Sequence, residues 1–157
     1  MTDVFNLLDA AVSEDDRVRE GHRFRRAMIG QEVGAKLTGL SLYELPPGER
    51  AWAYHYELNR EEWVIVVAGE VVVRTPDGDR VLAVGDVVCF PPGAAGAHQV
   101  RNDSDAPARF AMPSSWAGDG YVAIRPDSNT ALIVGPGFRR IVPLDEDLGY
   151  WDREPEV

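Results

Sequence analysis

The chain has 157 residues, 45% of them hydrophobic and 27% charged, a length and composition typical of one globular domain. The 26 acidic residues outnumber the 16 basic ones and give a net charge of -10, which disfavours nucleic acid and anionic membrane surfaces as partners. The longest unbroken apolar run, Trp63–Ala68, is too short to cross a bilayer, and the acidic amino terminus does not resemble a signal peptide. We therefore expect a cytoplasmic protein with no membrane partner. The single cysteine, Cys89, excludes an internal disulfide.

Strand-forming segments divide the chain into three parts of one predicted domain. Residues 1–35 combine a short apolar-periodic stretch with a charged run, which predicts a helix or a loop. From about 36–114, short segments rich in β-branched and aromatic residues alternate with Pro and Gly, which predicts an all-β barrel or sandwich. Residues 115–157 contain two weaker strand candidates, Tyr121–Arg125 and Ala131–Val134, followed by an acidic extension.

Two local patterns in the central part predict how its strands are arranged. The segment Thr75–Asp79 separates two Val-rich runs, and its Asp-Gly pair favours the positive φ of a tight turn, so we expect a β-hairpin there. The strand around Val64 is apolar on both faces, which indicates a second layer outside the barrel. Either a terminal segment or a second copy of the chain would supply that layer, and we expect a homodimer.

Two of the three histidines lie beside carboxylates in the β-rich part. His55 and Glu57 share one face of a predicted strand, and a hairpin after Leu58–Glu61 would return Glu62 beside His55. His98 begins a later strand, which a neighbouring place in the barrel would bring to the same cluster. Two imidazoles and two carboxylates suit Mn, Fe, Ni, Co or Zn, and two imidazoles with one carboxylate leave coordination positions open for a small-molecule substrate or oxygen.

The same residues resemble two motifs of a known family. The first cupin motif is matched by Gly48, His55, Glu57, Glu62 and Gly69. The second cupin motif is matched by Gly85, Pro91, Pro92, Gly93, His98 and Asn102. The chain thus resembles the cupin superfamily, and in particular small single-domain bacterial cupins. The resemblance implies a jelly-roll barrel, or double-stranded β-helix, with a divalent metal ion held by His55, Glu62 and His98, but it does not imply one reaction.

The sequence departs from the cupin motifs in two places. Glu57 stands where the first motif has its second histidine, and an anionic oxygen there favours harder ions. We predict Glu57 as a metal ligand, with the alternatives that it supports a ligand or acts as a catalytic proton-transfer group. In the second motif the expected histidine position falls on Gly96. His98 returns to the same face of the strand if the loop accommodates the additional residues.

The leading functional hypothesis is a metal-binding cupin that accepts a small molecule in the barrel and acts as an oxygenase, an isomerase or a lyase. The alternative is a non-catalytic module that binds or senses a small ligand and has a degenerate metal site. The replacement at Glu57 and the longer second motif are the features that favour this alternative. Neither hypothesis identifies the metal or the substrate, because the side chains that line the barrel set the specificity.

The remaining conspicuous residues have ordinary structural explanations. His22 lies outside the motifs and is expected at the surface, and Cys89 is expected to be a small buried hydrophobe. A run of arginines is interrupted by acids and predicts a solvated face: Arg17, Arg19, Arg23, Arg25 and Arg26. A set of aromatic residues lies mostly on the strand face opposite to His55, which predicts packing between sheets or in a dimer rather than a pocket: Trp52, Tyr54, Tyr56 and Trp63.

Overall fold

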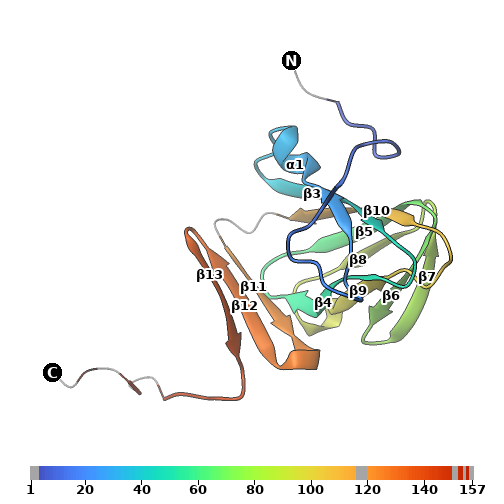
Figure 1. The fold of residues 1–157 in the computed structure, drawn as a ribbon. Coiled ribbons are helices and arrows are strands. Elements are labelled where there is room, and N and C mark those ends of the chain that lie inside the picture. Colours follow the sequence, from blue (N-terminus) through green and yellow to red (C-terminus); the bar gives the residue numbers. More distant parts are fainter. Residues whose placement is uncertain (1–3, 116–119, 150–151, 154, 156–157) are drawn as a thin grey trace.

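The structure is a computed structural model that describes residues 4–115, 120–149, 152–153 and 155 (Figure 1). Its elements in chain order are β1 (Ser13–Glu14), β2 (Arg25–Ala27), α1 (Ile29–Glu32), β3 (Thr38–Leu45), β4 (Arg50–Glu57), β5 (Glu62–Ala68), β6 (Glu70–Thr75), β7 (Gly78–Ala83), β8 (Val87–Phe90), β9 (His98–Arg101), β10 (Ala108–Ser115), β11 (Tyr121–Arg125), β12 (Thr130–Gly135) and β13 (Phe138–Pro143), with short 3-10 helices at Ala94–Gly96 and Pro126–Ser128. Each strand-forming segment predicted between residues 36 and 114 is present, as β3 to β10.

The strands form two sheets. The six-stranded sheet has the order β1-β2-β3-β10-β5-β8, and the seven-stranded sheet has the order β13-β12-β11-β4-β9-β6-β7. From β3 to β6, and again from β7 to β10, the chain alternates between the two sheets. The strand pairs are antiparallel. This is the all-β jelly-roll barrel, or double-stranded β-helix, that the sequence predicts.

The hydrophobic core lies inside the barrel between the two sheets. Alternate residues of β5, Val64 and Val66, are buried with exposed fractions of 0% and 2%, as expected for a strand with one face toward the core. Phe110 of β10 is fully buried and stacks on Tyr43, its cross-strand partner in β3, with ring centroids 5.1 Å apart. Contacts of this kind between directly opposed residues stabilise the pairing of β3, β10 and β5.

A second hydrophobic cluster covers part of the outer face of the six-stranded sheet. Ile29 of α1 and Leu42 of β3 are its buried centre, and Val67 of β5 packs against it. The amino-terminal segment contributes Leu7, Ala10 and Val12. The predicted second layer is therefore present, and over this part of β5 the amino-terminal segment supplies it. Trp63, near the start of β5, is 37% exposed; a homodimer stays a prediction.

One predicted hairpin is present and one is not. In the hairpin of β6 and β7, Thr75 pairs with Gly78, whose φ of 109° confirms the predicted tight turn. The predicted hairpin of β4 and β5 is wrong, because β4 pairs with β9 and β11 while β5 pairs with β10 and β8 in the other sheet. Both edges of β4 are occupied, so the chain crosses the barrel instead. Asn59 in this connection donates a hydrogen bond to the carbonyl oxygen of Gly120 at 3.0 Å.

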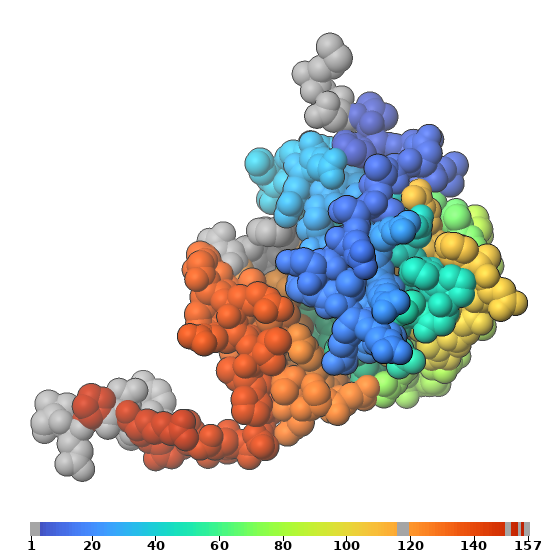
Figure 2. Space-filling model, in the orientation of Figure 1, coloured from blue at the N-terminus to red at the C-terminus, as the bar shows by residue number. Residues whose placement is uncertain are grey.

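The two terminal segments flank the barrel. In Figure 2 the amino-terminal segment (blue) and the carboxy-terminal strands (orange) lie side by side over one face of the molecule. The prediction of a helix or loop for residues 1–35 is partly wrong, because β1 and β2 extend the six-stranded sheet and α1 is a single turn. The predicted carboxy-terminal strands are confirmed as β11 and β12, and β13 is an additional strand. Among the described residues, no helix is long and apolar enough to span a membrane.

Candidate metal centre

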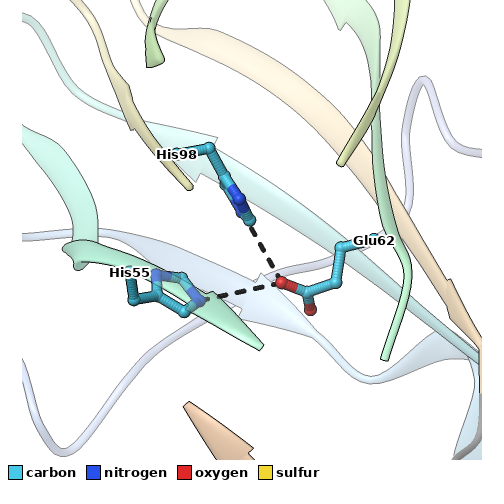
Figure 3. A group of neighbouring side chains, drawn as sticks. All are labelled: His55, Glu62 and His98. Carbon is cyan, nitrogen blue, oxygen red and sulfur yellow. Dashed lines mark ion pairs between the residues drawn. The ribbon is translucent and has the colours of Figure 1, made fainter. Parts of the chain in front are cut away.

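His55, Glu62 and His98 come together inside the barrel (Figure 3). His55 of β4 pairs directly with His98 of β9, and their ring centroids are 4.9 Å apart. Glu62 reaches both rings from β5 in the other sheet. Its Oε2 lies 3.7 Å from Nε2 of His55 and 3.5 Å from Nε2 of His98. The cluster thus joins His98 to two residues that precede it by more than 30 positions, and it needs both sheets of the barrel.

The backbone fixes the orientation of both imidazole rings. Nδ1 of His55 lies 2.8 Å from the carbonyl oxygen of Ala53. Nδ1 of His98 lies 2.9 Å from the carbonyl oxygen of Gly96. Because a carbonyl only accepts, Nδ1 of each neutral ring carries the proton and Nε2 keeps its lone pair. Phe90 also stacks on the His98 ring, with centroids 3.8 Å apart and an interplanar angle of 10°. Both Nε2 lone pairs are therefore held toward the same carboxylate.

The three donors fit a divalent metal ion. Nε2 of His98 and Oε2 of Glu62 are buried and have no hydrogen-bond partner among the described residues, a costly state unless another group binds these atoms. Donors bound to one ion at about 2.1 Å lie roughly 3.0–3.4 Å apart. The separations from Glu62 of 3.5 and 3.7 Å are close to this range. Two imidazole nitrogens and a carboxylate oxygen suit Mn, Fe, Co, Ni or Zn.

A bulge in β4 shapes the strand that carries His55. The register between β4 and β9 shifts between Ala51 and His55, and Trp52 has a φ of 57°. A positive φ is unusual for a bulky residue and breaks the alternation of side chains along the strand. As a result, the consecutive residues Ala51 and Trp52 both pack on the core. The predicted packing of Trp52 is confirmed, since it packs on the core, but contrary to the prediction it also lines the cavity described below.

The loop before β9 explains the departure from the second motif. At Gly96, an added Cβ would collide with the backbone carbonyl oxygen of Pro91, so this position has no room for a larger residue. The 3-10 turn Ala94–Gly96 accommodates the additional residues of the loop. His98 then begins β9 and is only 3% exposed. The longer loop therefore brings His98, two residues later, to the face that a histidine at the motif position would occupy.

A cavity of about 500 Å³ adjoins two of the three donors, His55 and Glu62. His55, Glu57 and Glu62 line one side of it, and the amino-terminal segment and β11–β13 supply other walls. This volume is within the range of small-molecule sites. The basic residues on its walls are Arg17, Arg26, Lys36, Arg60, Arg125 and Arg139. Although acidic residues outnumber basic ones in the whole chain, basic residues outnumber acidic ones on the walls of this cavity.

The profile of the Cupin domain family matches residues 41–113 of this chain. The barrel that contains these residues is a cupin domain. One similar structure comes from Acidithiobacillus ferrooxidans and carries a provisional name as a sugar phosphate isomerase. It is 26% identical, with a TM-score of 0.75, and the match covers 82% of this chain and 81% of that one. No curated protein matches the chain at a significant level.

Two further cupin folds are similar at lower identity. A sugar phosphate isomerase of the cupin superfamily from Silicibacter pomeroyi is 23% identical with a TM-score of 0.76, over 85% of this chain and 87% of that one. A predicted oxalate decarboxylase from Thermotoga maritima is 19% identical with a TM-score of 0.59, over 71% of this chain and 97% of that one. At these identities the likeness concerns the fold alone. Cupins commonly bind a divalent metal, and the His/Glu/His cluster of this cupin could hold one.

Glu57 of this cupin lies next to the three donors without belonging to the group that meets within 4.8 Å. Its side chain is buried, and its Oε2 has no hydrogen-bond partner among the described residues. Nε of Arg60 lies 3.2 Å from that oxygen, and the Arg60 guanidinium lies 4.0 Å above the ring of Tyr121. Arg60 is thus held between Tyr121 and Glu57. The role of Glu57 as a direct metal ligand stays a prediction.

The buried carboxylates have shifted pKa values of opposite direction. Burial, with the charge of Glu62 added to it, raises the pKa of Glu57 to about 7, against the opposing effect of Arg60. Burial, the largest single effect, acts to raise the pKa of Glu62, but hydrogen bonding to His55 and the positive charges of His55, His98 and Arg60 together outweigh it, so that pKa is lowered. Burial and the charge of His55 lower the pKa of His98 to about 4. Near neutral pH, Glu62 is therefore ionised and His98 neutral, which are the states that bind metals.

Two arginines of the predicted solvated face have a further role: Arg17 is exposed as predicted and Arg26 is half-buried, but both contact a buried acid. Arg17 and Arg26 both pair with buried Asp15, at 2.8 and 2.6 Å from its Oδ2. Their guanidinium groups lie 4.5 and 5.5 Å from the ring centroid of Trp52. A buried carboxylate is unfavourable unless positively charged groups pair with it, and the two arginines are these partners. These arginines therefore fix the amino-terminal segment against the barrel and form part of the cavity wall.

Two other predicted side chains lie outside the cavity. His22, predicted at the surface, is half-buried, and burial lowers its pKa. Cys89 of β8 is half-buried rather than fully buried, and burial raises the pKa of its thiol. A raised thiol pKa disfavours the reactive thiolate, which agrees with a structural role for Cys89.

Sequence analysis missed the contribution of the carboxy-terminal strands to the cavity. Tyr121 and Arg125 of β11, together with Arg139 of β13, line it, but none of them belongs to a recognised motif. The one local signal was the alternation along Tyr121–Arg125, which places the first and last residue on one face of the strand. Which face meets the barrel follows only from the pairing of β11 with β4.

Proposed function

We propose that this cupin is a metal-dependent isomerase that moves a proton between neighbouring carbon atoms of a small hydroxy-carbonyl compound. The observation that carries the proposal is the position of the buried Glu57 carboxylate on the same cavity as the donors His55 and Glu62. A carboxylate beside a metal-capable cluster can serve as the base of such a reaction. The provisional name of the Acidithiobacillus ferrooxidans relative, a sugar phosphate isomerase, supports the same reaction class.

The metal would be held by His55, Glu62 and His98. A divalent ion in this place would supply a Lewis acid that polarises a substrate carbonyl oxygen. Because His55 and Glu62 line the cavity, a substrate in the cavity would have access to an ion held by these side chains. The hydrogen bonds from Nδ1 to backbone carbonyls keep both imidazoles in the ligating orientation while the substrate exchanges.

Glu57 would take the proton from the carbon next to the carbonyl. The carbon–hydrogen bond breaks, and its electron pair forms the carbon–carbon double bond of an enediolate. The former carbonyl oxygen gains a proton from the neighbouring hydroxyl group of the substrate. Glu57 then returns its proton to the former carbonyl carbon. No electron leaves the substrate, so the reaction needs no oxidant or reductant. Arg60, held beside Glu57, stabilises negative charge that develops on the substrate.

The test combines metal analysis with proton exchange. The protein is prepared with divalent Mn, Fe, Co, Ni or Zn and incubated in heavy water with a panel of aldoses and ketoses, both free and phosphorylated. Proton NMR then measures their interconversion and the entry of deuterium at the carbon next to the carbonyl. We expect Glu57→Gln to keep its metal and to lose both signals by roughly 100-fold or more, the usual effect of removing a general base.

Glu61→Gln is the matched control, because Glu61 lies in the connection that follows Glu57 but accepts a hydrogen bond from Trp63 and does not line the cavity. It should retain wild-type exchange. A Glu57→Gln variant as active as the wild type would overturn the proposed role of Glu57. Ligand binding without metal and without deuterium entry would favour the non-catalytic binding module.

A further inference from the structure

The strands β11, β12 and β13 extend the seven-stranded sheet beyond β4, and this carboxy-terminal part of the sheet, called the carboxy-terminal sheet below, turns one face toward the cavity. In β11, the alternating residues Tyr121, Ala123 and Arg125 all line the cavity. Ala123 pairs with Glu57 of β4, so this face of β11 continues the face that carries the proposed base. Arg139 of β13 lies in the same cross-strand row as Tyr121 and also lines the cavity. Two arginines from different strands therefore share one wall.

These two arginines have no acidic partner in the part of the chain that the structure describes. Other arginines of the same cavity have such a partner: Arg17 and Arg26 pair with Asp15, and Arg60 lies 3.2 Å from the carboxylate of Glu57. Neither Arg125 nor Arg139 forms such an ion pair among the described residues. Burial, and then the positive charge of Arg139, lower the pKa of Arg125. Two neighbouring cations on a partly buried wall repel each other, and a bound anion would relieve that repulsion.

We propose that Arg125 and Arg139 form an anion subsite that binds the phosphate group of the substrate. The inference rests on the proposed function, because the carbonyl end of the same substrate would lie at the metal-capable cluster. Guanidinium groups suit this role, since each offers paired hydrogen-bond donors that match phosphate oxygens. In a chain with a net charge of -10, such a subsite provides a local attraction for anions that the net charge of the chain does not.

The arrangement of the strands sets the direction of the substrate. Because β11 and β4 are antiparallel, Arg125 lies on the His55 side of the pair between Ala123 and Glu57. Arg139 lies two strands farther from β4 and is exposed to solvent. Arg125 is thus the member of the pair nearer the cluster, and Arg139 is the member nearer the rim of the cavity. A short phosphorylated chain would place its phosphate toward the rim and its carbonyl toward the cluster.

The first experiment measures anion binding without catalysis. The full chain, with metal and after chelation, is titrated with inorganic phosphate and followed by phosphorus NMR, with acetate as the comparison anion. We expect Arg139→Gln and Arg125→Gln each to weaken phosphate binding at least tenfold, with metal content unchanged. Arg125→Lys keeps a positive charge at this half-buried position and should be affected less.

Arg140→Gln is the matched control. Arg140 is the next residue of β13, so its side chain belongs to the opposite face of the sheet, and it does not line the cavity. This variant should bind phosphate as the wild type does. Equal phosphate affinity in Arg139→Gln and Arg140→Gln would overturn the subsite, as would absence of phosphate binding by the wild type at tens of millimolar. Acetate binding of equal strength would show a general anion site and overturn the assignment to phosphate.

The second experiment separates the subsite from the proposed reaction. With a phosphorylated ketose, Arg139→Gln should raise KM at least tenfold and leave kcat near the wild-type value, whereas the KM for the unphosphorylated ketose should not change. Phosphate binding that depends on Arg139 in a protein without isomerase activity would uphold the subsite and refute the function. Turnover of unphosphorylated sugars without phosphate binding would uphold the function and refute the subsite.

Discussion

The barrel and the carboxy-terminal sheet line the same cavity in different ways. In the barrel, β3 to β10, the side chains of the metal-capable cluster are held by the core itself: His98 is 3% exposed and stacks on Phe90. In β11–β13 the strands are more open, with Phe138 and Ile141 exposed to 48% and 47%. The pairing of β11 with β4 consists of two residue pairs, Ala123 with Glu57 and Ile124 with Tyr56.

This difference shows how one cavity can combine a fixed centre with an adjustable wall. Moving a donor of the barrel requires repacking of the core, which is closely packed and tolerates little change. Changing a side chain on β13 alters the wall without disturbing the metal-capable cluster. We therefore expect the two regions to separate in mutational experiments, with effects on stability and metal binding in the barrel and effects on ligand choice in the carboxy-terminal sheet.

The largest difference between the regions should appear in stability. Phe110→Ala removes a fully buried ring that stacks on Tyr43, and such truncations cost about 3–5 kcal/mol because they leave a cavity. Ile141→Ala in β13 removes a half-exposed side chain and should cost about 0.5 kcal/mol or less. Urea unfolding curves of both variants measure these costs. Equal losses would show that the carboxy-terminal sheet belongs to the same packed core.

The second expected effect concerns the metal. His98→Ala removes one of three donors, so we expect the affinity for divalent ions to fall by roughly 100-fold or more, a loss at least as large as that caused by removing a supporting residue. Competition with a chromophoric chelator measures the affinity. Arg139→Gln, on the other wall, should bind metal as the wild type does. A metal affinity that is unchanged in His98→Ala would remove His98 from the proposed centre.

A smaller effect is expected where the amino-terminal segment joins the barrel. Hydrogen bonding to Arg17, with the charge of Arg26 in addition, lowers the pKa of Asp15 from 3.8 to about 2. A carboxyl group with a lowered folded-state pKa stabilises the fold above its unfolded pKa and loses this contribution as the pH falls from about 4 to 2. Asp15→Asn should therefore cost about 1–2 kcal/mol at neutral pH. The difference from the wild type in thermal unfolding should shrink steadily below about pH 4; a constant difference would contradict the ion-pair explanation.

The smallest effect is expected at a contact between the two regions. Arg74 of β6 pairs with Asp127, in the connection of β11 to β12, at 2.6 Å and stacks over Tyr54 at 3.9 Å. Both charged side chains are about half exposed, so the pair should contribute less than about 1 kcal/mol. A double-mutant cycle of Arg74→Gln and Asp127→Asn measures the coupling at low and high salt. A larger, salt-independent coupling would mean that this contact fixes the carboxy-terminal sheet to the barrel.

The sequence predicted the barrel well because its strands have strong local signals. The Val-rich segments of β5, β6 and β8 and the turn at Gly78 depend on residues close together in the chain. The two motifs also singled out His55, Glu62 and His98, the three residues that meet in the structure. Their spacing reflects positions along successive strands of a barrel, so it survives even where the loop before β9 is longer.

Features that depend on strand pairing could not be predicted in the same way. The short connection Leu58–Glu61 is compatible with a hairpin, and only the occupied edges of β4 show that the chain crosses to the other sheet. The bulge at Trp52 reverses the side chain without any glycine to mark it. Arg125 and Arg139 stand outside every motif, and the register of β11–β13 alone brings them to one wall.

The inward position of Trp52 has a practical consequence. Its indole Nε1 donates a hydrogen bond to the hydroxyl of Tyr43 at 3.1 Å, while the ring itself borders the cavity beneath Arg17. Indole emission is sensitive to nearby charge and to displaced water, so ligand entry will alter the fluorescence of this residue. Because the bulge turns Trp52 toward the cavity, its fluorescence can be used to follow ligand binding, and a Trp52→Phe variant would lack this signal.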